Sequence, residues 1–274
     1  MFNGQPADVV LAHIKDLTGD VDAHSIGAPA YTTEKQVFHT DVGDVIALFA
    51  LESAEEGGES FLASSWTVYN ELAATRPDLI HTLAEPWDFD ESVAVPSHIV
   101  LIMFNERMKR FGKTGPPGYT SRPLLHYQRA TADGDPERLI IQYARRALTG
   151  YWGLPRSPNI PPITEAQAEA LDALHFAAEK HAVSLDFRPG DVQFVNNLSI
   201  FHARGSFRNS AEKQCVFFLS LSFSVFLFVV FVLRCVRANG LVDAIWCGCG
   251  SATTSLPGRR RRVCRAAGTA CIRA

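Results

Sequence analysis

The stretch GDVQFVNNLSIFHAR, residues 190–204, decides the fold of this chain. Two short apolar runs, 192–195 and 198–201, flank an asparagine pair, and turn-forming residues precede them. Short apolar runs bounded by turn residues are typical of β-strands. The pattern therefore predicts two consecutive strands, with His202 emerging from a rigid scaffold at the end of the second.

The segments around this stretch alternate short strands, turns and a few helices. A capping box, Thr164-x-x-Gln167, predicts a helix that runs to about Lys180. Further helices are predicted within 9–17, from an N-cap at Ser65, and over 78–83. Strands are predicted over 36–41, 45–51, 60–63, 97–104 and 138–144, and a loop over 111–123. Together they predict a β-rich α+β fold, a sandwich or barrel with helical insertions.

His39 and Asp41 stand two residues apart in a predicted strand, so their side chains point to the same face. His202 supplies a third candidate ligand. Two histidines and one carboxylate on one face of an octahedral ion form the ligand set of non-haem Fe(II) oxygenases. Two structural alternatives remain open here: an ordinary ion pair at a strand end, and a histidine packed in the core beside Phe201.

Three motifs carry a resemblance to a known family: FHTD at 38–41, GGES at 57–60, and the stretch at 190–204. In order and separation they resemble the taurine dioxygenase-like (TauD/TfdA) family of Fe(II)- and 2-oxoglutarate-dependent oxygenases, especially its fungal members. The resemblance covers about residues 7–214.

The resemblance implies a double-stranded β-helix (jelly roll) in which His39, Asp41 and His202 bind iron. It also implies that Ser60 occupies the position of a threonine whose hydroxyl contacts a carboxylate of 2-oxoglutarate. The implied reaction uses O₂ to hydroxylate a small organic substrate and releases succinate and CO₂.

The composition of residues 1–214 restricts partners and compartment. This part has no cysteine and holds 18 basic and 28 acidic residues, a net charge of −10. No basic stripe is available to neutralise phosphates, which argues against a nucleic-acid binder. The first residues lack the pattern of a signal peptide. We therefore expect a cytoplasmic protein whose partner is a small-molecule substrate.

The composition changes sharply after Gln214. All six cysteines lie in 215–274, which holds eight arginines and one acidic residue, a net charge of +7. Residues 215–233 are nineteen uncharged residues followed by Arg234, a pattern typical of a transmembrane helix. The alternative hypothesis is therefore a single-pass membrane protein with an acidic soluble domain and a basic tail rich in cysteine and arginine.

The restricted alphabet of 215–233 suggests a different origin for the tail. Only Phe, Leu, Ser, Val and Cys occur there, and each has codons with T at the first or second base. We interpret 215–274 as an aberrant tail, a retained intron followed by a frameshifted exon. The oxygenase domain, 1–214, is then truncated, and we expect its jelly roll to be incomplete at both ends.

The resemblance implies an arginine, after the distal histidine, that binds the distal carboxylate of 2-oxoglutarate. Neutral residues follow Gln214 instead. We therefore expect this chain to bind Fe(II) weakly and to turn over little or no 2-oxoglutarate. A zinc hydrolase using the same three ligands is a further alternative. It would need a general base near the metal-bound water, and no glutamate stands at motif spacing to supply one.

Overall fold

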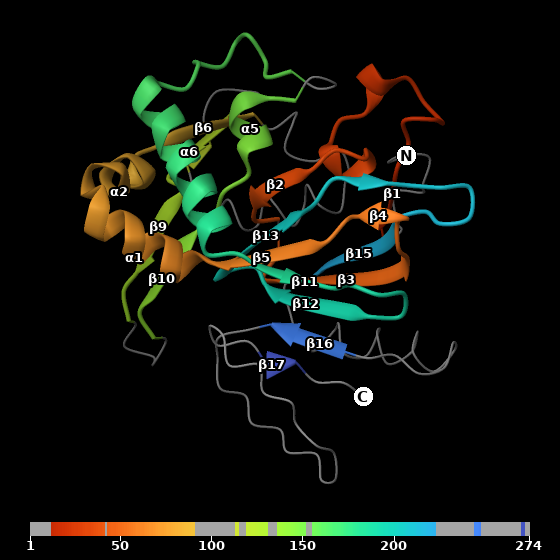
Figure 1. Ribbon diagram of the computed structural model, residues 1–274. Helices are drawn as coiled ribbons and strands as arrows, with labels where there is room; N and C mark the ends of the chain where they lie inside the picture. The colour runs from red at the N-terminus through yellow and green to blue at the C-terminus, as the bar shows by residue number, and fades with distance from the viewer. Residues whose placement is uncertain are drawn as a thin grey trace.

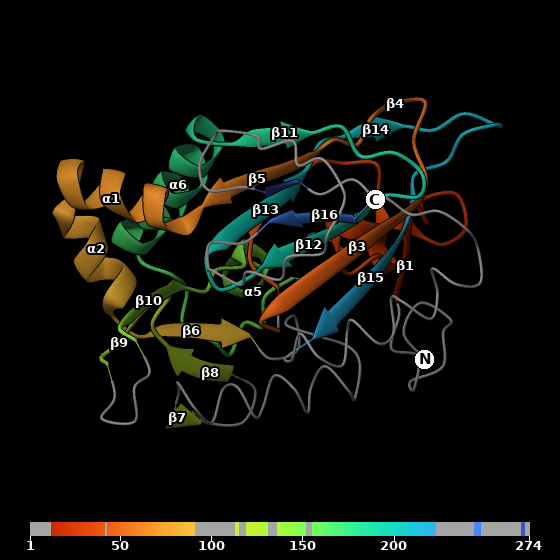
Figure 2. The ribbon, with the colours of Figure 1, turned by 90° about the horizontal axis from the view of Figure 1, so that it is seen from below.

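The computed structural model describes residues 12–41, 43–90, 113–114, 119–130, 136–151, 155–222, 244–247 and 270–271. Two sheets carry most of the strands, and helices α1, α2 and α6 gather at one end of them (Figures 1 and 2). This architecture confirms the β-rich α+β prediction.

The larger sheet has six strands in the order β1-β15-β3-β12-β16-β17. Their bounds are β1 Ala12–Lys15, β15 Val216–Ser222, β3 Val45–Glu52, β12 Val192–Asn196, β16 Ala244–Cys247 and β17 Ala270–Cys271. All neighbours pair antiparallel except β12 and β16, which run parallel.

The smaller sheet positions the two histidines predicted as ligands. It is antiparallel, in the order β11 (Val183–Leu185), β5 (Ser60–Ser64), β13 (Ile200–Arg204) and β2 (Gln36–His39). A cluster of Ile46, Leu62 and Val195 joins the inner faces of the two sheets. Burial of these apolar side chains holds one sheet against the other.

Helices cover the end of the molecule shown at the left of Figure 1. They are α1 Ser65–Thr75, α2 Pro77–Ala84 and α6 Glu165–Lys180. The other helical segments are α5 Arg145–Thr149 and the 3₁₀ turns η1 Ala23–Ser25 and η2 Pro29–Tyr31. The predicted capping box of α6 is present: Gln167 N donates to Thr164 Oγ1 over 3.2 Å, and Thr164 N donates to Gln167 Oε1 over 3.0 Å. The N-cap of α1 is Ser64, one residue before the predicted Ser65.

Short strands complete the described structure. They are β4 Glu56–Gly57 with β14 Phe207–Arg208, β6 Trp87–Asp90 with β8 Tyr119–Arg122 and β7 Lys113–Thr114, and β9 Leu125–Gln128 with β10 Arg138–Ile141. The predicted loop over 111–123 was therefore wrong, since it contains β7 and β8. The predicted strand over 97–104 lies outside the described residues.

The predicted helix within 9–17 was also wrong, because Ala12–Lys15 forms strand β1. Its four residues pair with 216–219 of β15, about two hundred positions further along the chain. Hydrogen bonds from this distant partner override the local preference of so short a segment.

The alternative hypothesis required a helix over 215–233, and the described part of that segment contradicts it. Val216–Ser222 is strand β15, which lies between β1 and β3. The backbone of this segment is satisfied by strand pairing on both sides rather than within a helix. Across the described ranges, no helix has the length and apolar character needed to cross a membrane.

Candidate functional site

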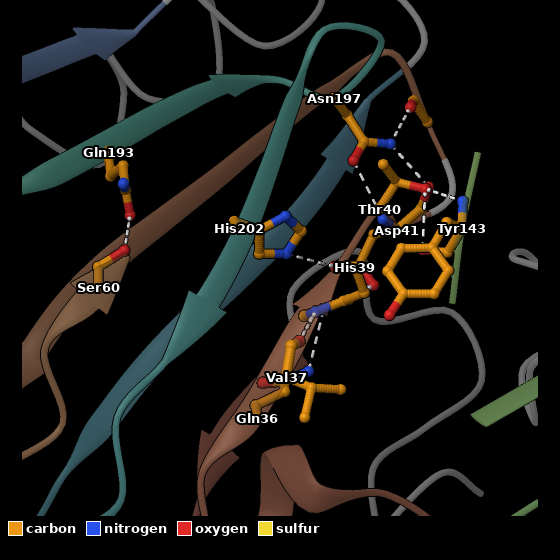
Figure 3. A network of polar contacts seen from close by, with 11 residues as sticks. Gln36, Val37, His39, Thr40, Asp41, Ser60, Tyr143, Gln193, Asn197 and His202 are labelled. Carbon is orange, nitrogen blue, oxygen red and sulfur yellow. Dashed lines mark hydrogen bonds and ion pairs between the residues drawn. The ribbon is translucent and has the colours of Figure 1, made fainter. Parts of the chain in front are cut away.

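Three side chains predicted as metal ligands converge at one point. The possible ligand atoms of His39, Asp41 and His202 all lie within 4.8 Å of one another. His39 ends β2 and is the cross-strand partner of His202 in β13, while Asp41 follows two residues after the strand (Figure 3). The adjacent strands therefore bring together residues separated by more than 160 positions.

The Asp41 carboxylate faces both imidazole rings. Its Oδ1 lies 3.7 Å from His39 Nε2, and its Oδ2 lies 3.5 Å from His202 Nε2. The two ring centroids are 4.2 Å apart. Both imidazoles are buried, whereas the Asp41 side chain keeps 30% of its surface exposed. The group is thus accessible from the side of Asp41.

Hydrogen bonds define the tautomer of His39. The Nδ1–H of this residue donates to the carbonyl oxygen of Val37 over 2.8 Å, so that Nε2 is the unprotonated nitrogen. This Nε2 accepts a hydrogen bond of 3.0 Å from the Gln36 amide. Metal-binding histidines commonly donate their second ring N–H to a backbone carbonyl in this way, which orients the ring. His39 is therefore arranged to present Nε2 to a cation.

The surroundings of His39 and Asp41 give these residues the charge states that binding of a divalent metal requires. Burial and the neighbouring His202 lower the pKa of His39 to about 4, against the opposing effect of Asp41. Burial raises the pKa of Asp41, but the hydrogen bond with His202 and the charges of His39, His202 and Arg146 outweigh it and bring the pKa to about 2. At neutral pH the group therefore offers a neutral His39 and an ionised carboxylate, as metal ligation requires.

The segment that carries Asp41 is held from one side by Asn197, whose side chain is fully buried. Asn197 Oδ1 accepts from the Asp41 backbone N–H over 3.0 Å, and Nδ2 donates to the carbonyl oxygens of Asp41 and Gly43 over 2.6 and 2.7 Å. These bonds fix the loop after β2. The sequence prediction treated the asparagine pair only as a turn and missed this role.

A second contact holds the same segment through Thr40, which lies between His39 and Asp41 in the sequence. Thr40 N donates to the carbonyl oxygen of Tyr143 over 2.7 Å, and Tyr143 N donates to Thr40 Oγ1 over 2.9 Å. Asp41 is thus positioned from two sides, by the backbone of Tyr143 in the β10–α5 connection and by the side chain of Asn197 in the β12–β13 turn.

Ser60 lies on the face of the smaller sheet that carries His202, because it pairs with Arg204, two residues after His202. Its hydroxyl donates to Gln193 Oε1 over 2.9 Å, and both side chains are buried. Ser60 thus shares the face of His202, and its hydroxyl is directed to Gln193. Gln193 was not identified from the sequence as a site residue.

Two arginines lie near the site, with different roles. Arg204 donates to the backbone carbonyls of Pro29, Ala30, Thr32 and Glu34, so its guanidinium serves the structure. The half-buried Arg146 of α5 donates to the carbonyl of Gly27, and its positive charge lowers the pKa values of both His39 and Asp41. Strand β15, with the sequence VFFLSLS, contributes no basic side chain.

The donor set fits a divalent transition-metal ion. Two imidazole nitrogens and one carboxylate leave further positions of an octahedral ion open for other ligands. Within the described ranges this is the one group of at least three such side chains close enough to hold a metal. The neutral His39, the ionised Asp41 and the orienting bond to Val37 all agree with that use.

Comparisons with known proteins agree with this geometry. Residues 10–216 match the family described as taurine catabolism dioxygenase TauD, TfdA family. The taurine hydroxylase-like protein SAT17 of Stachybotrys chartarum is 37% identical over 204 residues, which is 72% of this chain and 46% of that protein. FR-33289 synthase of Streptomyces rubellomurinus is 24% identical over 181 residues, 66% of this chain and 46% of that protein.

The chain thus spans about half the length of these curated relatives. A solved structure of an asparagine oxygenase in complex with Fe(II), 3-hydroxyasparagine and succinate superimposes with a TM-score of 0.51 and 16% sequence identity. The match covers 84% of this chain and 59% of that one. At this identity the likeness shows a shared fold.

Proposed function

This chain belongs to the TauD/TfdA family, and from this premise we propose that it is an Fe(II)- and 2-oxoglutarate-dependent dioxygenase that hydroxylates a small organic substrate in the cytoplasm. The convergence of His39, Asp41 and His202 carries the proposal. The two facing sheets are the halves of a jelly roll, an assignment supported by the fold shared with the asparagine oxygenase.

Each side chain of the group has a defined part. His39 and His202 would hold iron through their imidazoles, and Asp41 would hold it through its carboxylate. Val37 and Asn197 fix the orientation of His39 and of the Asp41 loop. Bound iron, with 2-oxoglutarate and O₂, supplies the oxidising power that converts a C–H bond to an alcohol and releases succinate and CO₂. Burial lowers the pKa of His39, so that its imidazole is neutral and can accept a metal at neutral pH.

Ser60 belongs to the part of the site that holds 2-oxoglutarate, and its place on the face of His202 supports this role. Residues 1–214 are the oxygenase domain, and 215–274 arise from a retained intron and a frameshift. The absence of a basic residue from Val216–Ser222 supports a low affinity for 2-oxoglutarate and slow turnover by this chain.

The function is tested by measuring succinate formation from 2-oxoglutarate, with and without added Fe(II), in air. We expect slow formation that requires Fe(II) and is abolished by Asp41→Ala, which removes the carboxylate ligand. The variant His81→Gln, in an exposed position of α2, is the matched control and should behave like the parent chain. Succinate formation that persists unchanged in Asp41→Ala would refute the proposal.

The origin of the tail has a separate test, the sequence of the spliced transcript across the codons for 214–274. We expect the main transcript to encode an arginine-containing strand after Gln214 in place of the neutral segment. A main transcript that encodes 215–233 as written would overturn the retained-intron hypothesis and leave the dioxygenase proposal standing.

A further inference from the structure

A polar bridge crosses the interior between the two sheets close to the metal group. Ser60 of β5 donates to Gln193 of β12 over 2.9 Å (Figure 3). The neighbouring contacts between the sheets are apolar, through Ile46, Leu62 and Val195. A polar pair in such surroundings is costly to bury unless its hydrogen-bonding groups are used.

The hydrogen-bond donors of Ser60 and Gln193 differ in whether they have an acceptor. A serine hydroxyl has one proton, and that of Ser60 is directed to Gln193 Oε1. The Gln193 side chain is fully buried, and its Nε2, with two protons, has no hydrogen-bond partner among the described residues. The available donor of the bridge is therefore the Gln193 amide rather than the Ser60 hydroxyl.

The strand register places Ser60, the partner of this donor, one step from the metal group. His202 pairs with Leu62, and Ser60 stands two residues before Leu62 on the same face of β5. Such diagonal neighbours in an antiparallel pair lie about 7–8 Å apart. A five-carbon 2-oxo diacid held by the metal at its keto acid extends its other carboxylate over a comparable distance.

The cation that the register places opposite Ser60 is already engaged within the fold. Arg204 pairs directly with Ser60 in the register, but its guanidinium donates to four backbone carbonyls and packs over the Phe207 ring at 4.7 Å. Strand β15, beside β3 in the facing sheet, is neutral. The unpartnered amide of Gln193 is therefore the hydrogen-bond donor available to that carboxylate.

We propose that Gln193 Nε2 binds the distal carboxylate of 2-oxoglutarate and that Ser60 is a positioning residue that holds the Gln193 amide in orientation. The inference rests on the proposed function. It revises the role that the family resemblance implies for Ser60, from direct contact to orientation through Gln193. A neutral amide in place of a guanidinium also accounts for weak binding, because charge-assisted hydrogen bonds are the stronger kind.

The test compares two ligands that differ only at the distal end. The Fe(II)-loaded protein, kept free of oxygen, is titrated by calorimetry with 2-oxoglutarate and with 2-oxovalerate, which has a methyl group in place of the distal carboxylate. The ratio of the two dissociation constants cancels effects on metal binding and on folding. We expect the parent chain to prefer 2-oxoglutarate, and Gln193→Met to reduce that preference about tenfold or more.

Further variants separate the two residues. Ser60→Thr keeps the hydroxyl and should keep the preference, whereas Ser60→Ala should reduce it while leaving the affinity for 2-oxovalerate unchanged. Gln167→Met, the same substitution in the exposed capping box of α6, is the matched control. If Gln193→Met retains the full preference of the parent chain, or if the parent chain has no preference, the inference is wrong and the dioxygenase proposal stands. If the parent chain binds neither acid, both fail.

Discussion

Asn197 shows how one side chain can determine the geometry of a metal group without being a ligand. It is fully buried and uses both ends of its amide on the loop that carries Asp41. The loop after β2 that carries Asp41 is not part of a strand ladder, so its backbone groups need other hydrogen-bond partners. The Asn197 amide provides such partners, and so it fixes the distance from Asp41 to the two imidazoles.

We expect Asn197→Ala to weaken Fe(II) binding about 10–100-fold, the usual effect of removing a group that orients a ligand. The variant should also lose about 2 kcal/mol in the free energy of unfolding, because it leaves buried backbone groups unpaired. Metal titration and denaturant unfolding measure the two effects. Asn159→Ala, at an exposed position, is the control. An Asn197→Ala protein that binds Fe(II) as tightly as its parent would contradict this role.

His175 of α6 makes the stability of the protein depend on pH. Burial lowers its pKa, although Glu179 at 3.1 Å favours the charged form; Lys35 and Arg145 lower the pKa further and Asp172 raises it. An unfolded histidine has a pKa of about 6.5. Below that pH the unfolded chain binds more protons than the folded one, so stability falls as the pH falls.

When the pH is lowered from about 7.5 to about 5.5, we expect the free energy of unfolding to decrease less for His175→Gln than for the parent chain. Denaturant unfolding of the metal-free proteins at both pH values measures the difference. His81→Gln, at an exposed position, should follow the parent. Equal losses in His175→Gln and the parent chain would show that this residue does not contribute.

At the scale of elements, strand β15 is the feature that the sequence prediction treated as foreign to the domain. It lies between β1 and β3, and its Phe217, with Cys215 just before the strand, is part of a buried cluster. Phe217 is buried and stacks on Phe187 with ring centroids 5.3 Å apart. Without this strand, both β1 and β3 would present unpaired edges.

If β15 is embedded as described, Phe217→Ala should lower the free energy of unfolding by about 3 kcal/mol, because a large buried side chain is replaced by a cavity. Phe176→Ala is the matched control, since the Phe176 side chain on α6 is 61% exposed. Denaturant unfolding compares them. A Phe217→Ala protein no less stable than Phe176→Ala would mean that 216–222 does not belong to the folded domain.

Sequence patterns predicted the elements whose partners or caps are local or strongly apolar. The strands at β2, β3, β5, β12 and β13 and the capped helix α6 were found within a few residues of their bounds. Strand β1 was missed because its pairing comes from β15, far along the chain. For the site, residue types and spacing made His39, Asp41 and His202 candidate ligands, and the family resemblance selected them over the structural alternatives. Gln193 and Asn197 were not identified, since their roles depend on hydrogen bonds between segments that only the fold brings together.

At the scale of the whole molecule, two facing sheets and a helical end hold one group of ligands in place. His39 and His202 come from adjacent strands of the smaller sheet, and Gln193 reaches toward Ser60 from the larger one. The metal group and the bridge beside it therefore depend on the packing of both sheets. Changes that separate the sheets should impair metal binding even when every ligand is retained.

Binding of iron by the three side chains is measured by Fe(II) titration of the metal-free protein in the absence of oxygen. We predict one Fe(II) site per chain, which is lost in Asp41→Ala and in His202→Ala but retained in His81→Gln. A parent chain that binds no Fe(II), or binding that survives both ligand substitutions unchanged, would contradict it.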